Sequence, residues 1–162
     1  MASADTLLIL TPHSFVIPTG NPAAYSSRNG HPVLAYDDTT NENAIASCLM
    51  PQHYAGGGVT VYLHYSMAST TTGTVDWDVA FERIGDQQLD IDADSFASAQ
   101  SVDGTTVPGT SGFVDVVSVA FTDGAQMDSV AAGEAFRIKV TRDAANDATG
   151  DAELHRVEIR ET

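Results

Sequence analysis

The chain has 162 residues, the length of one domain that can bury a hydrophobic core without disulfides. Its 22 Asp and Glu residues against 7 Lys and Arg give a formal net charge of −15. Such a surface repels phosphate backbones and anionic lipids, which argues against nucleic acids and membranes as partners. A single cysteine, Cys48, excludes an intramolecular disulfide and a multi-cysteine zinc site, and its apolar neighbours predict a buried thiol.

Residues 6–10 and 15–17 are two short β-prone segments, and Pro18 closes the second. Proline beside a strand confines that strand to an edge or a bend. Residues 1–18 are therefore expected to form either an edge strand or an arm that docks on another subunit, and residues 19–162 a single domain. A docking arm would make these apolar side chains a candidate attachment site: Leu7, Leu8, Ile9, Leu10, Phe15 and Ile17.

The start of the chain lacks the pattern of a signal peptide. Asp5 stands where a positive region is needed, and the apolar run at residues 7–10 is only four residues long. Nowhere does the sequence approach the roughly 20 apolar residues of a transmembrane helix. Synthesis in the cytoplasm is expected, and later assembly into a particle that leaves the cell stays open.

Turn residues dominate residues 19–31, which are expected to be a loop that contains the turn dipeptide Asn29-Gly30. Short apolar runs at residues 33–36 and 44–50 then predict two strands.

The clearest periodicity lies in residues 59–67 and 75–81, where apolar and polar side chains alternate as in strands with one buried face. The Ser/Thr/Gly connection at residues 68–74 has the composition of a turn. An antiparallel β-hairpin is therefore expected. Together with the later strands it predicts a buried face of Val61, Leu63, Tyr65, Val75, Trp77, Val79, Phe81, Val119, Phe121, Phe136, Ile138 and Val140.

Asp90, Asp92 and Asp94 have the spacing with which several calcium loops begin, because hard cations prefer clustered carboxylates. An EF-hand would need glycine at its sixth position and glutamate at its twelfth, where this chain has Ser95 and Ser101. A solvated edge with outward carboxylates is expected instead, and calcium binding by the three aspartates stays open.

Residues 113–121 have apolar side chains at both sets of alternate positions, so both faces of the strand are apolar. This pattern is typical of an interior strand or of a strand whose second face meets another subunit. In the second case Phe113, Val114 and Val116 are a candidate subunit interface. An apolar face that one small sandwich leaves uncovered favours self-association, so a homotrimer is expected.

Alternation returns in residues 134–142, and residues 152–160 form the last strand. There Leu154 is out of phase with the apolar residues that follow it, which predicts a β-bulge near residues 155–156.

Cations concentrate near the end of the chain, at Arg137, Lys139, Arg142, Arg156 and Arg160. If the last two strands pair with each other, they make one basic stripe on an acidic body. Arg137, Lys139 and Arg160 are for that reason the second candidate attachment site.

No catalytic signature is present. The five histidines lack metal-site spacing, and there is no Gly-x-Ser-x-Gly elbow. Asp76 and Asp78 share one face of a strand, but glycoside hydrolysis also needs a substrate cleft between its two carboxyls. Tyr54 and Tyr62 are candidates for stacking on sugars. We expect no enzyme, no cofactor and no metal site.

Short strands separated by Gly, Pro, Ser and Asp turns predict an all-β fold, a two-sheet antiparallel β-sandwich of jelly-roll type with about eight or nine strands. The segments RNGHPVLAYDDTTNENAIASCLMPQHYAGGGVTVYLHY, GTVDWDVAFERI and AAGEAFRIKVTRDAANDATGDAELHRVEIRET resemble a family of small jelly-roll virion proteins of tailed bacteriophages, of capsid decoration, cement or fibre-knob type. The resemblance spans residues 28–162, and its motifs are architectural.

This resemblance implies a structural virion protein, a capsid decoration or cement subunit that stabilises the head by bridging major capsid proteins. It would act as a homotrimer in the virion after synthesis in the host cytoplasm. The alternative is a carbohydrate-binding or receptor-recognition jelly-roll module of a tail, baseplate or head fibre, with a glycan as partner. No catalytic residue follows from the resemblance.

Overall fold

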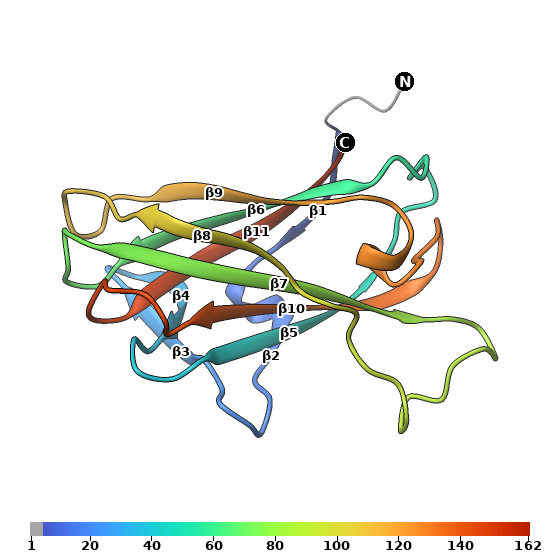
Figure 1. Cartoon of the computed structure of the whole chain (residues 1–162), viewed down its shortest axis with the longest axis horizontal. Helices are drawn as coiled ribbons and strands as arrows, with labels where there is room; N and C mark the ends of the chain where they lie inside the picture. Colours follow the sequence, from blue (N-terminus) through green and yellow to red (C-terminus); the bar gives the residue numbers. More distant parts are fainter. Residues whose placement is uncertain (1–4) are drawn as a thin grey trace.

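The computed structural model describes residues 5–162, within which the chain forms eleven strands and two short 3-10 helices (Figure 1). Sheet A has the order β3-β4-β11-β6-β9, and β1 also pairs with β11. Its strands are β1 (Thr6–Leu10), β3 (Ala24–Arg28), β4 (His31–Tyr36), β6 (Val59–Met67), β9 (Asp115–Phe121) and β11 (Ala152–Glu161).

Sheet B has the order β2-β5-β10-β7-β8. Its strands are β2 (Phe15–Val16), β5 (Glu42–Leu49), β7 (Thr74–Ile84), β8 (Gln100–Thr106) and β10 (Ala135–Asp143), and the 3-10 helices are η1 (Pro12–Ser14) and η2 (Ala125–Met127). The two antiparallel sheets enclose one apolar core. The predicted all-β, two-sheet sandwich is confirmed. It has more strands than expected, because short or polar strands lack the apolar alternation from which strands are predicted. None of the helices in residues 5–162 is long and apolar enough to cross a membrane.

The core lies between the sheets, and every side chain of the predicted buried face is at most 3% exposed. Trp77 of β7 packs edge-on against Tyr36 of β4 and Tyr65 of β6, with ring centroids 5.1 and 5.6 Å away. Offset and edge-on aromatic pairs of this kind stabilise a core beyond their buried area. Cys48 is half-buried against the core, and burial raises the pKa of its thiol to about 11.

The predicted hairpin is wrong, because β6 and β7 lie in different sheets. β6 pairs with β11 and β9, whereas β7 pairs with β10 and β8. Residues 68–73 therefore cross from one sheet to the other. Two strands that face each other across a core bury the same parity as two strands of one hairpin, so periodicity identifies the buried side chains but not the neighbouring strand.

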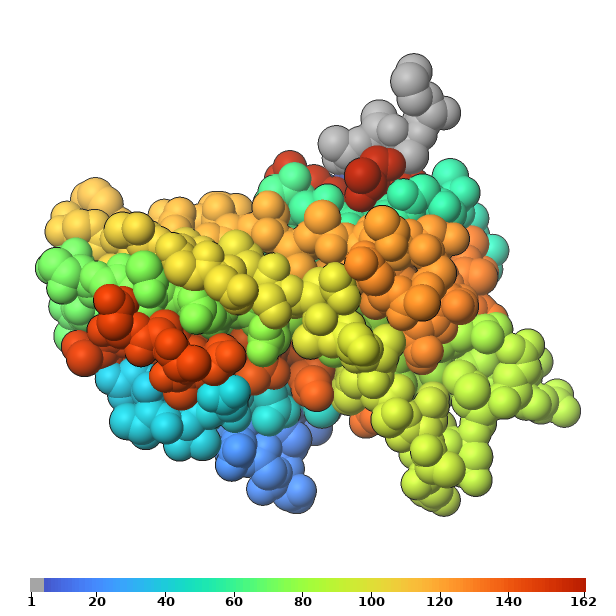
Figure 2. Space-filling model, in the orientation of Figure 1, coloured from blue at the N-terminus to red at the C-terminus, as the bar shows by residue number. Residues whose placement is uncertain are grey.

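Two polar segments also differ from the expectation. Residues 24–28 form β3, which pairs with β4 through the predicted Asn29-Gly30 turn, whose φ angles are 47° and 80°. The side chains of β3 are mostly exposed, so the strand has no apolar alternation to reveal it. Residues 89–96 form no strand edge but belong to the long β7–β8 connection, which projects from the body in yellow-green (Figure 2).

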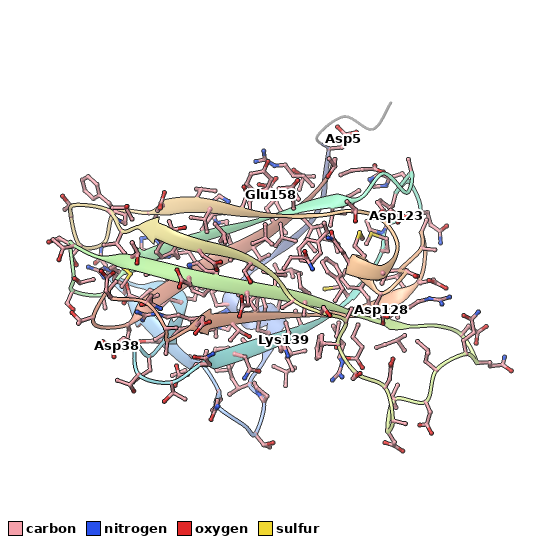
Figure 3. The ribbon with its side chains drawn as sticks, in the orientation of Figure 1. Asp5, Asp38, Asp123, Asp128, Lys139 and Glu158 are labelled. Atoms are coloured by element: carbon pink, nitrogen blue, oxygen red, sulfur yellow. The ribbon has the colours of Figure 1, made fainter. Side chains whose placement is uncertain are left out.

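The predicted basic stripe is wrong as well. β10 lies in sheet B and β11 in sheet A, so Lys139 and Glu158 lie on strands of different sheets (Figure 3). Arg142 has the same parity as the buried Val140 and is itself fully buried. The cations of the last two strands therefore belong to separate environments.

β11 is the central strand of sheet A and pairs with three others. β6 follows one edge, while β4 pairs with residues 152–154 and β1 with residues 157–160 on the other edge. The register shifts between Leu154 and Arg156, which confirms the predicted bulge. Since the bulge comes where the pairing passes from β4 to β1, it opens the outer face of sheet A around residues 155–156.

Candidate functional site

A cleft of about 400 Å³ lies on the outer face of sheet A, where the bulge of β11 meets the β3–β4 turn and the segment before β9. Its volume is within the range of ordinary ligand sites. We call it the His–Arg cleft; it is lined by Arg28, Asn29, His31, His64, Gly112, Val114, His155 and Arg156.

Arg28 builds one wall and is held by other parts of the chain. Its Nη1 donates to Glu153 Oε2 at 2.7 Å and to the Met67 carbonyl at 3.0 Å, and its Nη2 donates to Ser111 Oγ at 3.0 Å. Gly112 lies close against this guanidinium, since a Cβ there would be 2.8 Å from Nη2. The wall is therefore preformed, and both terminal nitrogens of Arg28 donate within the protein.

His155, the residue in the bulge, is oriented by a short hydrogen-bond chain. Ser66 donates its hydroxyl proton to Glu153 Oε2 at 3.1 Å, so in the 2.9 Å contact with His155 Nε2 the ring nitrogen is the donor. Burial lowers the pKa of His155, which keeps the ring neutral at pH 7. Nδ1 of this tautomer is therefore a hydrogen-bond acceptor.

His64 also lines the cleft, and one of its ring nitrogens is unsatisfied. Its Nε2 is buried and has no hydrogen-bond partner among the described residues; Glu158 Oε2 is 4.0 Å away. Burial lowers the pKa of His64, and the positive charge of Arg156 lowers it further. A buried nitrogen without a partner costs roughly 1–3 kcal/mol of stability.

Arg156 and His31 are two exposed polar side chains of the lining. Within residues 5–162 neither of them makes a hydrogen bond or an ion pair. The neighbouring Arg160 differs, since its Nη2 donates to Glu158 Oε2 at 2.8 Å and its guanidinium lies 4.3 Å from the centre of the Tyr62 ring. Arg156 is thus the cation of this face that is available to a ligand.

An apolar strip borders the cleft on the side of β9. Phe113, Val114 and Val116 are 64%, 53% and 47% exposed, and we call them the β9 strip. Val116 pairs in register with His64. Among the strands of the described chain β9 pairs with β6 alone, so the interior position considered for it is wrong. Alternate side chains of β9 are exposed, so its outer face is open. The cleft therefore combines polar walls with an apolar margin.

The candidate attachment residues of the N-terminal segment lie on this chain's own sandwich. Leu7, Leu10 and Phe15 are buried in the core, and Leu8 and Ile17 pack against it. Ile9 is 60% exposed on β1. Residues 1–4 of the expected arm or edge strand lie outside the described residues.

The second set of attachment candidates is divided between the two outer faces. Arg137 and Lys139 lie on sheet B, where their cationic groups are 5.1 and 4.7 Å from the Phe96 ring centre, and Arg137 also pairs with the buried Glu82. Arg160 lies on sheet A. The structure does not bring these three cations together.

The remaining candidates have structural partners. Tyr54, expected to be exposed, is buried, and its hydroxyl donates to Asp123 Oδ1 at 3.0 Å. Asp76 accepts from the Gly104 amide and Asp78 from the Ser101 hydroxyl on the outer face of sheet B. Across residues 5–162 no group of three or more His, Cys, Asp or Glu side chains is placed to hold a metal ion, Asp90, Asp92 and Asp94 included.

The sequence did not predict the histidines of the cleft as a site, because their spacing does not indicate that they lie close together. His31 follows a tight turn, His64 lies at a polar parity of β6, and His155 sits in the bulge. Only the order β4-β11-β6 brings them together, and this order is not local information. The one useful signal was the out-of-phase Leu154, which marked the bulge.

Comparison with known proteins finds no matching family model and no matching curated protein. Solved structures do match. A family 35 carbohydrate-binding module from Clostridium thermocellum aligns with a TM-score of 0.57 at 12% identity, over 98% of this chain and 100% of that one.

Two further structures agree with it. The CBM22-1 xylan-binding domain of Xyn10C from Paenibacillus barcinonensis gives a TM-score of 0.54 at 11% identity, over 99% of this chain and 96% of that one. The C-terminal CBM6 of LamC, a laminarinase from Zobellia galactanivorans, gives 0.52 at 12% identity, over 97% and 100%. The comparisons give no support to the phage virion family; at these identities they show that this chain has the β-sandwich fold of carbohydrate-binding modules.

Proposed function

We propose that this protein is a carbohydrate-binding module and that the His–Arg cleft binds its saccharide. The observation that carries the proposal is the composition of the cleft: planar hydrogen-bonding side chains lie beside the apolar β9 strip. Sugar rings present hydroxyl groups at their edges and C–H groups on their faces. They therefore suit a site with a few placed polar groups and an apolar surface.

The donors and acceptors of the cleft have separate roles in this proposal. Arg156 and His31 reach ring hydroxyls from the exposed side of the cleft. Val114 and Phe113 contact a C–H face. Because Arg28 is already fixed by Glu153 and Ser111, its wall needs little rearrangement on binding.

Binding without bond cleavage fits the same lining. Within the described residues no Asp or Glu belongs to it, so a glycosidic bond placed there would lack the two flanking carboxyls that hydrolysis requires. The solved modules of the same fold are themselves named as binding modules, which is the reason to prefer this function to an enzymatic one.

The test is affinity electrophoresis of the full chain in gels that contain soluble polysaccharides, followed by calorimetry with the best ligand. Val114→Asn should weaken binding at least about tenfold, since it removes apolar contact from the cleft margin. Val16→Asn is the matched control, because Val16 is 65% exposed on β2 of the opposite sheet. Equal loss in both variants, or no retardation by any polysaccharide, would contradict the proposal.

A second candidate is the structural virion role, in which a homotrimer decorates the major capsid protein. The observation in its favour is the β9 strip, because exposed apolar side chains on an edge strand favour association with another chain. Analytical ultracentrifugation at micromolar concentration tests it. A trimer that dissociates in the Phe113→Ser variant supports this role, and a monomer at several salt concentrations counts against it.

A further inference from the structure

The lining of the His–Arg cleft has the opposite charge character to the rest of the molecule. The chain as a whole carries −15, yet the residues that line the cleft include two arginines and three histidines. Glu153 and Glu158 lie nearby, and each is already paired with a different arginine. A local excess of positive charge on a strongly acidic protein requires an explanation.

Pairing within the protein accounts for two of the three arginines on this face. Arg28 is neutralised by Glu153 at 2.7 Å, and Arg160 by Glu158 at 2.8 Å. Arg156 is exposed, and the described residues offer its guanidinium neither an ion pair nor a hydrogen bond. Its five donors have the fork geometry that matches the two oxygens of a carboxylate or a sulfate.

Neutral imidazole rings surround this charge. His155 lies on β11 and His64 on β6, both beside Arg156. Burial disfavours protonation of each ring, and the charge of Arg156 disfavours it further. An anion next to Arg156 would neutralise the one cation of this face that has no partner among the described residues. His31 adds an exposed imidazole from β4. One anionic group can therefore contact both Arg156 and His31.

We propose that the ligand of the His–Arg cleft is an acidic saccharide whose carboxylate or sulfate group is bound by Arg156, with His31 as an additional hydrogen-bonding partner. This inference rests on the proposed function. The inference identifies the chemical class of the sugar. The apolar face of that sugar would still lie on the β9 strip.

The acidic body limits which acidic saccharides can bind. Charges separated by more than about 8 Å are largely screened at physiological salt, so a single anionic group mainly experiences Arg156. A densely charged polymer extends beyond the cleft, where it meets the carboxylates that dominate the surface. The preferred ligand therefore carries isolated anionic groups, such as one uronic acid residue in an otherwise neutral chain.

Calorimetry or ligand-observed NMR with the full chain tests the class of ligand. The probes are glucuronic acid, galacturonic acid and glucose 6-sulfate, with glucose and galactose as neutral counterparts and heparin as the densely charged polymer. We expect at least one acidic sugar to bind about tenfold more tightly than its neutral counterpart. The carboxylate and sulfate arms show which anionic group is preferred.

Arg156→Gln should reduce this preference to less than twofold, while Lys139→Gln, which removes the same charge from the opposite sheet, should keep it. Equal or tighter binding of the neutral sugars would overturn the acidic class and leave the proposed function standing. Absence of binding by every sugar and by neutral polysaccharides would overturn both. Heparin as the tightest ligand would overturn the isolated-charge inference.

Discussion

Two arginines near the end of the chain, Arg142 and Arg156, show what decides whether a cation stabilises the fold or serves a ligand. Arg142 is fully buried, and its guanidinium donates to the carbonyls of Tyr36, Ala148 and Gly150 at 2.7 to 2.9 Å. Arg156 is exposed in the cleft and uses none of its donors within residues 5–162. The difference lies in the surrounding backbone and not in the residue type.

The surroundings of Arg142 explain its burial. The loops at this end of the sandwich include Asp38, whose carboxylate accepts from the Gly150 amide at 2.6 Å (Figure 3). The nearby charges of Asp38 and Asp151 favour the charged form of Arg142, whereas burial lowers its pKa. Arg142 therefore joins the β10–β11 loop to the end of β4, a structural task that occupies both of its terminal nitrogens inside the protein.

Replacement of Arg142 gives the largest expected effect on stability. Arg142→Met should lower the free energy of unfolding by about 3 kcal/mol, because three carbonyls lose a charged donor in a buried site. Urea denaturation followed by tryptophan fluorescence measures the change, since Trp77 is fully buried in the core. Unchanged stability would mean that water replaces Arg142 as the donor to the loop carbonyls. It would contradict the structural role that distinguishes Arg142 from Arg156.

A smaller effect is expected at the wall of the cleft. Gly112 has a φ of +80°, and a Cβ there would push against the Arg28 guanidinium. Gly112→Ala should cost about 2 kcal/mol, part from the left-handed backbone and part from the displaced Arg28, and should weaken saccharide binding. Gly56→Ala is the matched control, with a φ of +83° and open space around it. Equal costs in the two variants would contradict a role for the Arg28 wall.

Low pH should reduce the stability of the fold through His64, a histidine of the cleft. Burial lowers the pKa of His64 below its ordinary 6.5, so the unfolded chain binds the proton more tightly. This contribution to stability is fully present above pH 6.5 and is lost as the pH falls below that value. The groups whose charges act on His64 are Arg156, Glu158 and Arg160.

His64→Gln should therefore flatten the loss of stability between about pH 7 and pH 5, as measured by urea denaturation at each pH. His53→Gln is the control, because His53 is exposed and away from the cleft. An unchanged slope in His64→Gln would mean that the acid response arises elsewhere in the chain.

The smallest expected effect on stability completes the comparison. Arg156→Met should change the free energy of unfolding by less than about 0.5 kcal/mol, as for an ordinary surface substitution, in the same urea experiment used for Arg142→Met. A loss above 1 kcal/mol would show that Arg156 supports the bulge of β11, and its assignment to the ligand would need revision.

The sequence predicted the fold well where side-chain parity carries the information. Trp77, Phe81 and Val140 face the core as expected, and the phase break at Leu154 marked the bulge. Pairing was harder, since β6 and β7 have the pattern of a hairpin but face each other across the core. β3 was missed because an exposed strand buries nothing and so has no pattern.

The candidate site was largely beyond sequence reasoning. Its polar groups come from β4, β6 and β11, which meet only in the folded sheet. Arg142 and Arg156 look alike in the sequence, although the parity of β10 does place Arg142 on the buried face with Phe136 and Val140. By contrast, Val114 was recognised as part of an exposed apolar face, and the structure adds that this face borders the cleft.

The pairing of β1 with β11 has a mechanical consequence. The strands are antiparallel and Thr6 pairs with Arg160, so the beginning of one lies beside the end of the other (Figure 1). A pulling force applied between Thr6 and Glu161 therefore acts at one end of this ladder. It breaks the inter-strand hydrogen bonds one after another, whereas a shearing force would load all of them at once. β1 should peel away at low force, while β11 stays anchored along its other edge by β6.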